Sequence, residues 1–134
     1  MLAAYSPMKT KPLALLALFI TAILPSYAGL AGKWTAEFDT QIGQQKYTYD
    51  FKQDGETLTG QATYDHAFGK GTVPLRSIRL DGDKVSFTET FSMEGNEIII
   101  AYRGTLAGDE LKLTRDVGDV ATEQLTARRA PAQN

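Results

Sequence analysis

Apolar and polar side chains alternate over most of the chain after residue 28, and this period of two is the feature that most constrains the fold. The alternation is plainest in residues 46–52, 84–91 and 110–114. A period of two with β-branched and aromatic enrichment predicts strands with one face buried and the other in water. No run there repeats apolar residues at helical spacing over three turns, so we expect an all-β fold.

Glycine-containing pairs separate the alternating runs, as expected for hairpin turns that need positive φ angles. Copies of one pattern (Gly, acid, any, apolar, polar, apolar, Thr) begin at Gly55, Gly82 and Gly108, and the first copy is truncated at Gly60. The copies start 27 and 26 residues apart, and each period holds one hairpin and its connection. This repeat predicts an up-and-down antiparallel meander.

The alternation and the turns together predict eight strands, over residues 33–39, 45–53, 57–63, 73–80, 84–91, 97–104, 110–116 and 121–129. Eight such strands can close into a barrel whose lumen holds side chains or one small ligand. The fourth strand is irregular, because Pro74 removes a ladder hydrogen bond and the alternation slips between Leu75 and Ile78. A bulge or a sheet edge is expected there.

Residues 1–28 have the order of a secretory signal peptide. A basic start at residues 8–11 precedes an apolar run over 12–25, and Ser26-Tyr27-Ala28 supplies small residues at the −3 and −1 positions. The apolar run is shorter than the roughly 20 residues that span a bilayer. We therefore expect cleavage after Ala28, a single domain over 29–134, and an exported protein, periplasmic or secreted, that does not insert into the membrane after cleavage.

The charge and the cysteine count exclude several classes of function. Without Lys9 and Lys11, 12 basic residues face 16 acidic ones, a formal charge of −4 for residues 29–134. A mildly acidic domain without a basic cluster argues against nucleic acid and anionic membranes as partners. The absence of cysteine excludes disulfides, thiolate chemistry and Cys-ligated zinc.

Strand direction alternates in a meander, so the connections sort onto two ends of the barrel. One end carries the turns at 54–55, 81–82 and 108–109 together with both termini of the domain. The other carries connections over residues 40–44, 64–72, 92–96 and 117–120. We expect the first end to be tight and the second to be long-looped, which places the mouth of a cup-shaped barrel at the second end.

The first and last predicted strands carry a pair of residues that can close the tight end. Gly32-Lys33-Trp34 opens the first strand, and Arg129 ends the last. In a closed barrel these strands are neighbours, so the guanidinium can lie over the indole, a contact worth about 1–2 kcal/mol. This Gly-x-Trp start with a late-strand Arg resembles the structural signature of lipocalins and the wider calycin group, over the strand plan of residues 29–134. The resemblance implies a structural plug formed by Trp34 and Arg129.

Typical lipocalins are longer and carry a helix and often a disulfide, which this sequence lacks. Residues 34–53 and 97–129 also resemble short secreted bacterial domains found alone or beside sugar-processing enzymes.

Three charged residues have inward parity near the long-looped end: Glu89, Arg115 and Glu123. Arg115 and Glu123 could face each other across the seventh and eighth strands. One interpretation is a buried cluster that satisfies its own hydrogen bonds. The other is a polar anchor that orients a carboxylate or a hydroxyl-rich ligand.

Aromatic residues near the same end have two interpretations as well. Tyr47, Tyr64 and Phe91 either help fill the barrel or offer a stacking surface to a sugar or an apolar ligand. The single histidine, His66, is expected in the 64–72 loop, as an exposed residue or, with Asp65, as a metal pair or an acid–base unit. The candidate ligand-binding residues are thus Tyr47, Tyr64, His66, Glu89, Phe91, Arg115 and Glu123.

Catalytic motifs find little support in the sequence. There is no Gly-x-Ser-x-Gly elbow and no phosphate-cradling or dinucleotide glycine loop, so we expect no cofactor and no metal. The first hypothesis is a non-catalytic module that binds a small apolar or hydroxylated ligand at the long-looped end. The alternative is a packed-barrel accessory or inhibitor-type domain beside an extracellular enzyme, for example a sugar-processing one. The third hypothesis is an enzyme built around His66, Asp65 and Tyr64.

Overall fold

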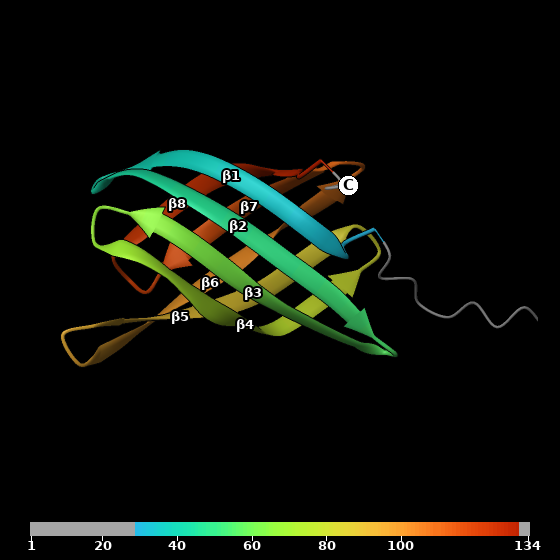
Figure 1. Cartoon of the computed structure of the whole chain (residues 1–134), viewed down its shortest axis with the longest axis horizontal. Helices are drawn as coiled ribbons and strands as arrows, with labels where there is room; N and C mark the ends of the chain where they lie inside the picture. The colour runs from blue at the N-terminus through green and yellow to red at the C-terminus, as the bar shows by residue number, and fades with distance from the viewer. Residues whose placement is uncertain (1–28, 132–134) are drawn as a thin grey trace, which may run out of the picture.

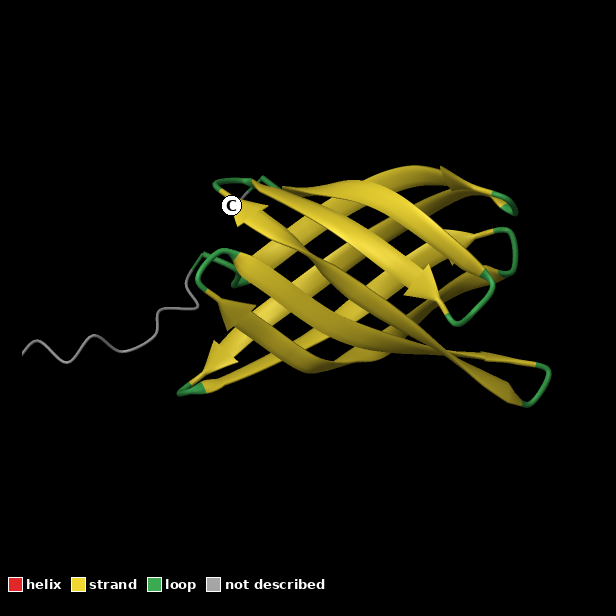
Figure 2. Cartoon of the chain, turned by 180° about the vertical axis from the view of Figure 1, so that it is seen from behind, coloured by secondary structure: helices red, strands yellow, loops and turns green. Residues whose placement is uncertain are grey.

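The computed structural model describes residues 29–131 as one closed barrel of eight antiparallel strands in sequence order (Figures 1 and 2). The strands are β1 (Gly32–Thr40), β2 (Gly43–Asp54), β3 (Thr57–His66), β4 (Gly69–Asp81), β5 (Lys84–Met93), β6 (Asn96–Ala107), β7 (Glu110–Val117) and β8 (Ala121–Arg129). Within these residues, no helix is long and apolar enough to cross a membrane. The predicted signal peptide lies outside the described residues and stays a prediction.

The all-β, up-and-down barrel predicted from the alternation is confirmed, and each predicted strand is present. The prediction of a long loop over residues 64–72 is wrong. β3 continues to His66 and β4 begins at Gly69, so only Ala67 and Phe68 form the turn. Gly69 and Gly71 lie in the β4 ladder, where they pair with His66 and Tyr64.

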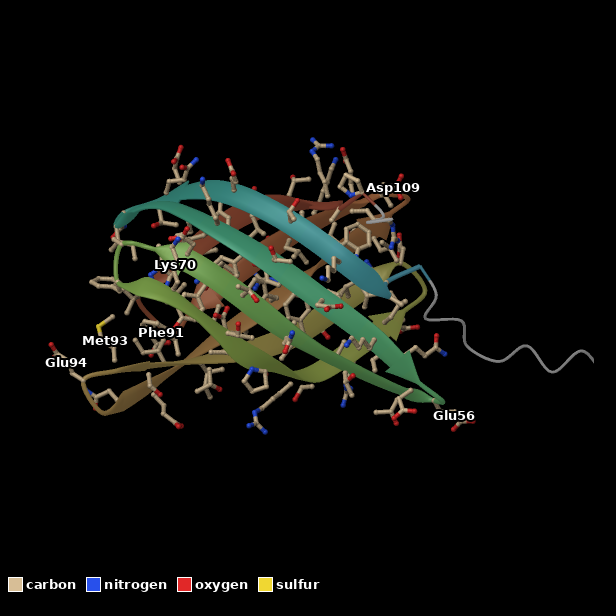
Figure 3. The ribbon with its side chains drawn as sticks, in the orientation of Figure 1. Glu56, Lys70, Phe91, Met93, Glu94 and Asp109 are labelled. Atoms are coloured by element: carbon tan, nitrogen blue, oxygen red, sulfur yellow. The ribbon has the colours of Figure 1, made fainter. Side chains whose placement is uncertain are left out.

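The predicted asymmetry of loop length between the two ends is therefore wrong as well. Two- or three-residue turns join the strands at both ends. We call the end with the turns at 41–42, 67–68, 94–95 and 118–120 the open end, because the cavity described below lies there. The other is the closed end. Figure 3 places Phe91, Met93 and Glu94 at the open end, and Glu56 and Asp109 at the closed end.

The irregularity predicted in the fourth strand is confirmed as a β-bulge. The β4–β5 register shifts between Arg76 and Arg79, and Ser77 has a φ of 54°. Beyond the pair Leu75–Glu89 the two strands no longer pair, so their open-end halves diverge. The β1–β8 ladder is shorter still, with two paired positions near the closed end.

The closed end is filled by side chains around Trp34. The Arg129 guanidinium carbon lies 4.3 Å from the centre of the Trp34 ring, which is the contact expected from the sequence. Trp34 Nε1 donates to the Leu30 carbonyl at 2.9 Å, and Arg129 Nη1 donates to the Ala31 carbonyl at 2.9 Å. Gly32 has a φ of 121° and would bring a Cβ within 3.1 Å of Arg129, so glycine is required there.

Candidate functional site

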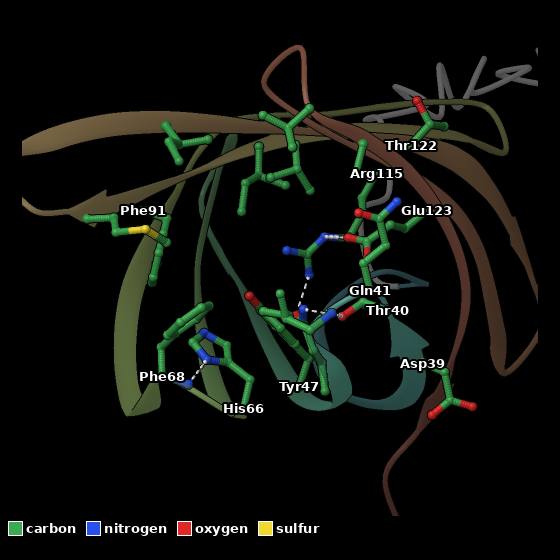
Figure 4. Close-up of a pocket in the computed structure, with 18 of the residues that line it drawn as sticks. Asp39, Thr40, Gln41, Tyr47, His66, Phe68, Phe91, Arg115, Thr122 and Glu123 are labelled. Atoms are coloured by element: carbon green, nitrogen blue, oxygen red, sulfur yellow. Dashed lines mark hydrogen bonds and ion pairs between the residues drawn. The ribbon is translucent and has the colours of Figure 1, made fainter.

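The open half of the barrel holds a cavity of about 770 Å³ (Figure 4). Its floor lies above the packed aromatic residues of the lumen, among them the fully buried Tyr49, Phe87 and Tyr102. The cavity is lined by side chains from β1, β2, β3, β5, β6, β7 and β8 and from the open-end turns: Asp39, Thr40, Gln41, Ile42, Gln45, Tyr47, His66, Phe68, Phe91, Met93, Ile98, Ile100, Arg115, Val117, Val120, Ala121, Thr122, Glu123 and Gln124. The lumen is thus filled at one end and hollow at the other.

Glu89 lies below the cavity floor and is completely buried. Its carboxylate accepts hydrogen bonds from Tyr47 Oη at 3.0 Å and from Tyr102 Oη at 2.6 Å. Tyr49 Oη in turn donates to Tyr102 Oη at 3.2 Å. Both carboxylate oxygens therefore have a donor, and this part of the polar cluster satisfies itself.

Arg115 forms part of the floor and is 3% exposed. Its Nη1 donates to Gln45 Oε1 at 3.3 Å, and its guanidinium lies over the rings of Phe38 and Tyr47, 5.2 and 5.0 Å from their centres. Nε is 3.2 Å from Glu123 Oε1, which makes an ion pair, but Nε is left without a hydrogen bond. Arg115 is thus only partly satisfied.

Burial is the largest single influence on the pKa of each of these groups. It raises the pKa of Tyr47 well above its usual value, and neighbouring Glu89 raises it further, so the hydroxyl stays protonated. Burial lowers the pKa of Arg115, but the surrounding tyrosines and Glu89 more than offset that effect, and the guanidinium stays charged. Burial also raises the pKa of Glu123, with Arg115 opposing the shift.

His66 forms an aromatic cluster at the edge of the cavity. Its ring stacks on Tyr64 with centres 4.7 Å apart and meets Phe91 edge-on at 5.6 Å. Its Nδ1 accepts the Phe68 N–H at 3.2 Å, a contact that holds the β3–β4 turn. Burial lowers the pKa of His66, and Arg115 lowers it further. The expectation that His66 lies in a loop is wrong, because it is the last residue of β3.

The acid–base unit considered for Asp65 and His66 has no geometric support. Adjacent strand residues point to opposite faces, and Asp65 pairs with Lys70 at 3.5 Å while His66 lines the cavity. Among residues 29–131, no group of three or more His, Cys, Asp or Glu side chains is placed to hold a metal ion.

Five of the seven candidate residues line the cavity: Tyr47, His66, Phe91, Arg115 and Glu123. Glu89 is below the floor and Tyr64 is behind His66, so neither lines it. Sequence reasoning missed Gln45, which is buried and bonded to Arg115. Its parity with Tyr47 was the signal that could have found it.

The sequence reasoning also missed a set of exposed apolar side chains at the cavity mouth. Each open-end turn carries or adjoins one: Ile42 (44% exposed), Phe68 (60%), Met93 (38%) and Val120 (76%). The closed-end turns carry Gly55-Glu56, Gly82-Asp83 and Gly108-Asp109 instead. We call the four apolar residues the apolar rim. An apolar residue inside a turn, where polar residues are usual, is the sequence signal for it.

No family model matches this sequence, and neither a curated protein nor a solved structure matches it. The fold and the geometry of the cavity therefore carry the argument about function.

Proposed function

We propose that this protein is an exported, non-catalytic, lipocalin-like module that binds a small apolar or hydroxylated ligand in the open-end cavity. The observation that carries the proposal is the cavity itself, with the incompletely bonded Arg115 in its floor. Small-molecule sites are mostly apolar hollows of about 300–1,000 Å³ with a few polar groups that orient the ligand. The cavity, at about 770 Å³, falls within that range.

The lipocalin-like assignment and export rest on different observations. The Trp34–Arg129 contact at the closed end supports the resemblance, because it joins the first and last strands as that signature implies. The sequence of residues 1–28 supports export to the periplasm or the medium.

Binding of a neutral fluorescent probe tests the ligand-binding proposal directly. N-phenyl-1-naphthylamine should bind the purified protein with increased fluorescence. Ile98→Trp, which fills the cavity, should weaken that binding, and Ile99→Trp is the matched control, because Ile99 is 60% exposed and the next residue of the same strand. Equal binding by the two variants would refute the cavity as the site. Native mass spectrometry should in addition show a co-purifying molecule that is lost on denaturation.

The apolar rim favours a second candidate function, an accessory or inhibitor-type domain beside an extracellular enzyme. All five exposed large hydrophobic residues in the described part of the chain lie at the open end: the apolar rim and Ile99. Exposed apolar patches mark interaction sites more often than isolated residues do. Under this hypothesis, Ile99→Ser, at the exposed residue of these five that does not line the cavity, should weaken binding to the partner enzyme and leave probe binding unchanged.

A further inference from the structure

The floor of the cavity presents a hydrogen-bond donor that the protein does not use. Arg115 Nη1 is bonded to Gln45, and Nε is held beside Glu123. Nη2 contacts neither Gln45 nor Glu123, and Figure 4 shows this third nitrogen of the guanidinium pointing into the cavity. A buried guanidinium with a free N–H is a strong donor for a ligand.

An acceptor lies next to this donor. Glu123 lines the cavity beside Arg115, opposite it in the β7–β8 ladder. Its carboxylate receives no hydrogen bond from the described residues, and its contact with Arg115 uses only Oε1. A ligand head at the floor therefore meets one donor and one acceptor together.

The charges around this point disfavour a charged head. An ammonium group can only donate and would face the guanidinium of Arg115. A carboxylate can only accept and would face the carboxyl group of Glu123, with the negative charge of Glu89 buried below the floor. A hydroxyl or a primary amide does both, since it can accept from Arg115 and donate to Glu123.

The walls above the floor are largely apolar on the side of β5, β6 and β7. Ile98, Ile100 and Val117 lead from the floor toward the apolar rim. Figure 4 shows Phe68 and Phe91 on the opposite side of the cavity from Glu123 and Thr122. Arg115 and Glu123 thus lie at the floor, and on the side of Ile98, Ile100 and Val117 the apolar surface continues to the mouth, which sets the orientation of an amphipathic ligand.

We infer that the cavity takes an uncharged amphipathic molecule, with an apolar chain and a hydroxyl or primary amide head, bound with its head between Arg115 and Glu123. This inference rests on the proposed function and adds the chemical class of the ligand and its direction. The chain of the ligand lies against Ile98 and Val117 and leaves past the apolar rim.

Four probes with the same ten-carbon chain test the inference: 1-decanol, decanamide, decanoate and decylamine. Each probe is titrated as a competitor against N-phenyl-1-naphthylamine bound to the purified protein. The pH is 7.5, where decanoate is anionic and decylamine cationic. The two neutral probes should bind at least about tenfold more tightly than either charged one, since like charges in a desolvated site repel strongly. Decanoate or decylamine binding as tightly as 1-decanol would overturn the inference and leave the proposed function intact. Failure of the fluorescent probe itself to bind would overturn both.

A charge-removing variant tests the position of the head. Glu123→Gln keeps the shape of the side chain and removes one negative charge from the floor, so the affinity for decanoate relative to 1-decanol should rise by at least about tenfold. Asp39→Asn is the matched control, because it removes the same charge from an exposed position on the cavity edge. It should change that ratio by less than about twofold, as solvent and salt screen exposed charges. Equal shifts in the two variants would show that the overall negative charge around the cavity, and not a head site beside Glu123, sets the preference for 1-decanol over decanoate.

Discussion

Replacing Glu89 by leucine should destabilise the protein strongly, although leucine is apolar and the site is completely buried. The change removes the acceptor of two tyrosine hydroxyls, at 3.0 and 2.6 Å, and leaves them buried. Each buried donor without a partner costs about 1–3 kcal/mol, which gives about 2–6 kcal/mol for the pair. Removing one member of a buried charged network typically costs about 3–5 kcal/mol, and we expect a loss in that range.

Urea unfolding followed by the fluorescence of Trp34, the single tryptophan, measures this loss. The midpoint should fall while the slope of the free energy of unfolding against urea stays the same. The matched control is the quadruple variant Tyr47→Phe, Tyr49→Phe, Glu89→Leu, Tyr102→Phe, which also removes Tyr49 Oη, the donor to Tyr102 Oη, so that none of the linked hydroxyls is left without an acceptor. It should recover at least about 1 kcal/mol of the loss. A Glu89→Leu protein as stable as the wild type, or a quadruple variant no more stable than Glu89→Leu, would refute the reasoning.

Three further measurements test other parts of the structure. Trp34→Ala should cost about 3–5 kcal/mol in a urea titration followed by circular dichroism, and a loss below about 1 kcal/mol would show that Trp34 is not the plug of the closed end. The single imidazole resonance of His66 should titrate below pH 6.5, because burial and Arg115 lower its pKa, and a midpoint at or above 6.5 would contradict this. As the pH falls, the unfolded chain, in which His66 has its ordinary pKa, binds the proton before the folded protein does. The free energy of unfolding therefore decreases as the pH falls through 6.5. Gly71→Ala should cost about 1–3 kcal/mol in the same titration, since overpacking forces neighbours to move; its Cβ would lie 2.5 Å from Tyr64 Oη, and unchanged stability would show that the Tyr64 ring is not held in place.

The strands and the inward-facing charges could be predicted from the sequence because both depend on the period of two. Parity alone placed Glu89 and Arg115 inside, and both are buried. The facing pair Arg115 and Glu123 also followed from parity, combined with the short connection between β7 and β8. Local patterns of this kind need no knowledge of what lies across the lumen.

Features that depend on packing across the barrel could not be predicted in the same way. Residues 64–72 were predicted to be a loop, but Gly71 lies in β4, where the Tyr64 ring occupies the space that a Cβ would need. That contact belongs to a neighbouring strand, so no local pattern of β4 reports it. The place where the β4–β5 ladder ends follows likewise from the twist that the bulge at Ser77 adds.

The short β1–β8 and β4–β5 ladders have a mechanical consequence. They pair two and five positions, whereas the other ladders pair seven to ten. The barrel is therefore two four-stranded shells, β1–β4 and β5–β8, hinged at the closed end. Separating the two shells at the open end breaks none of the long ladders. The open-end cavity can therefore widen to accept a larger ligand. The two short ladders limit how far the cavity can widen. One is the β1–β8 ladder, held by the contact of Trp34 with Arg129, and the other is the β4–β5 ladder beside the bulge.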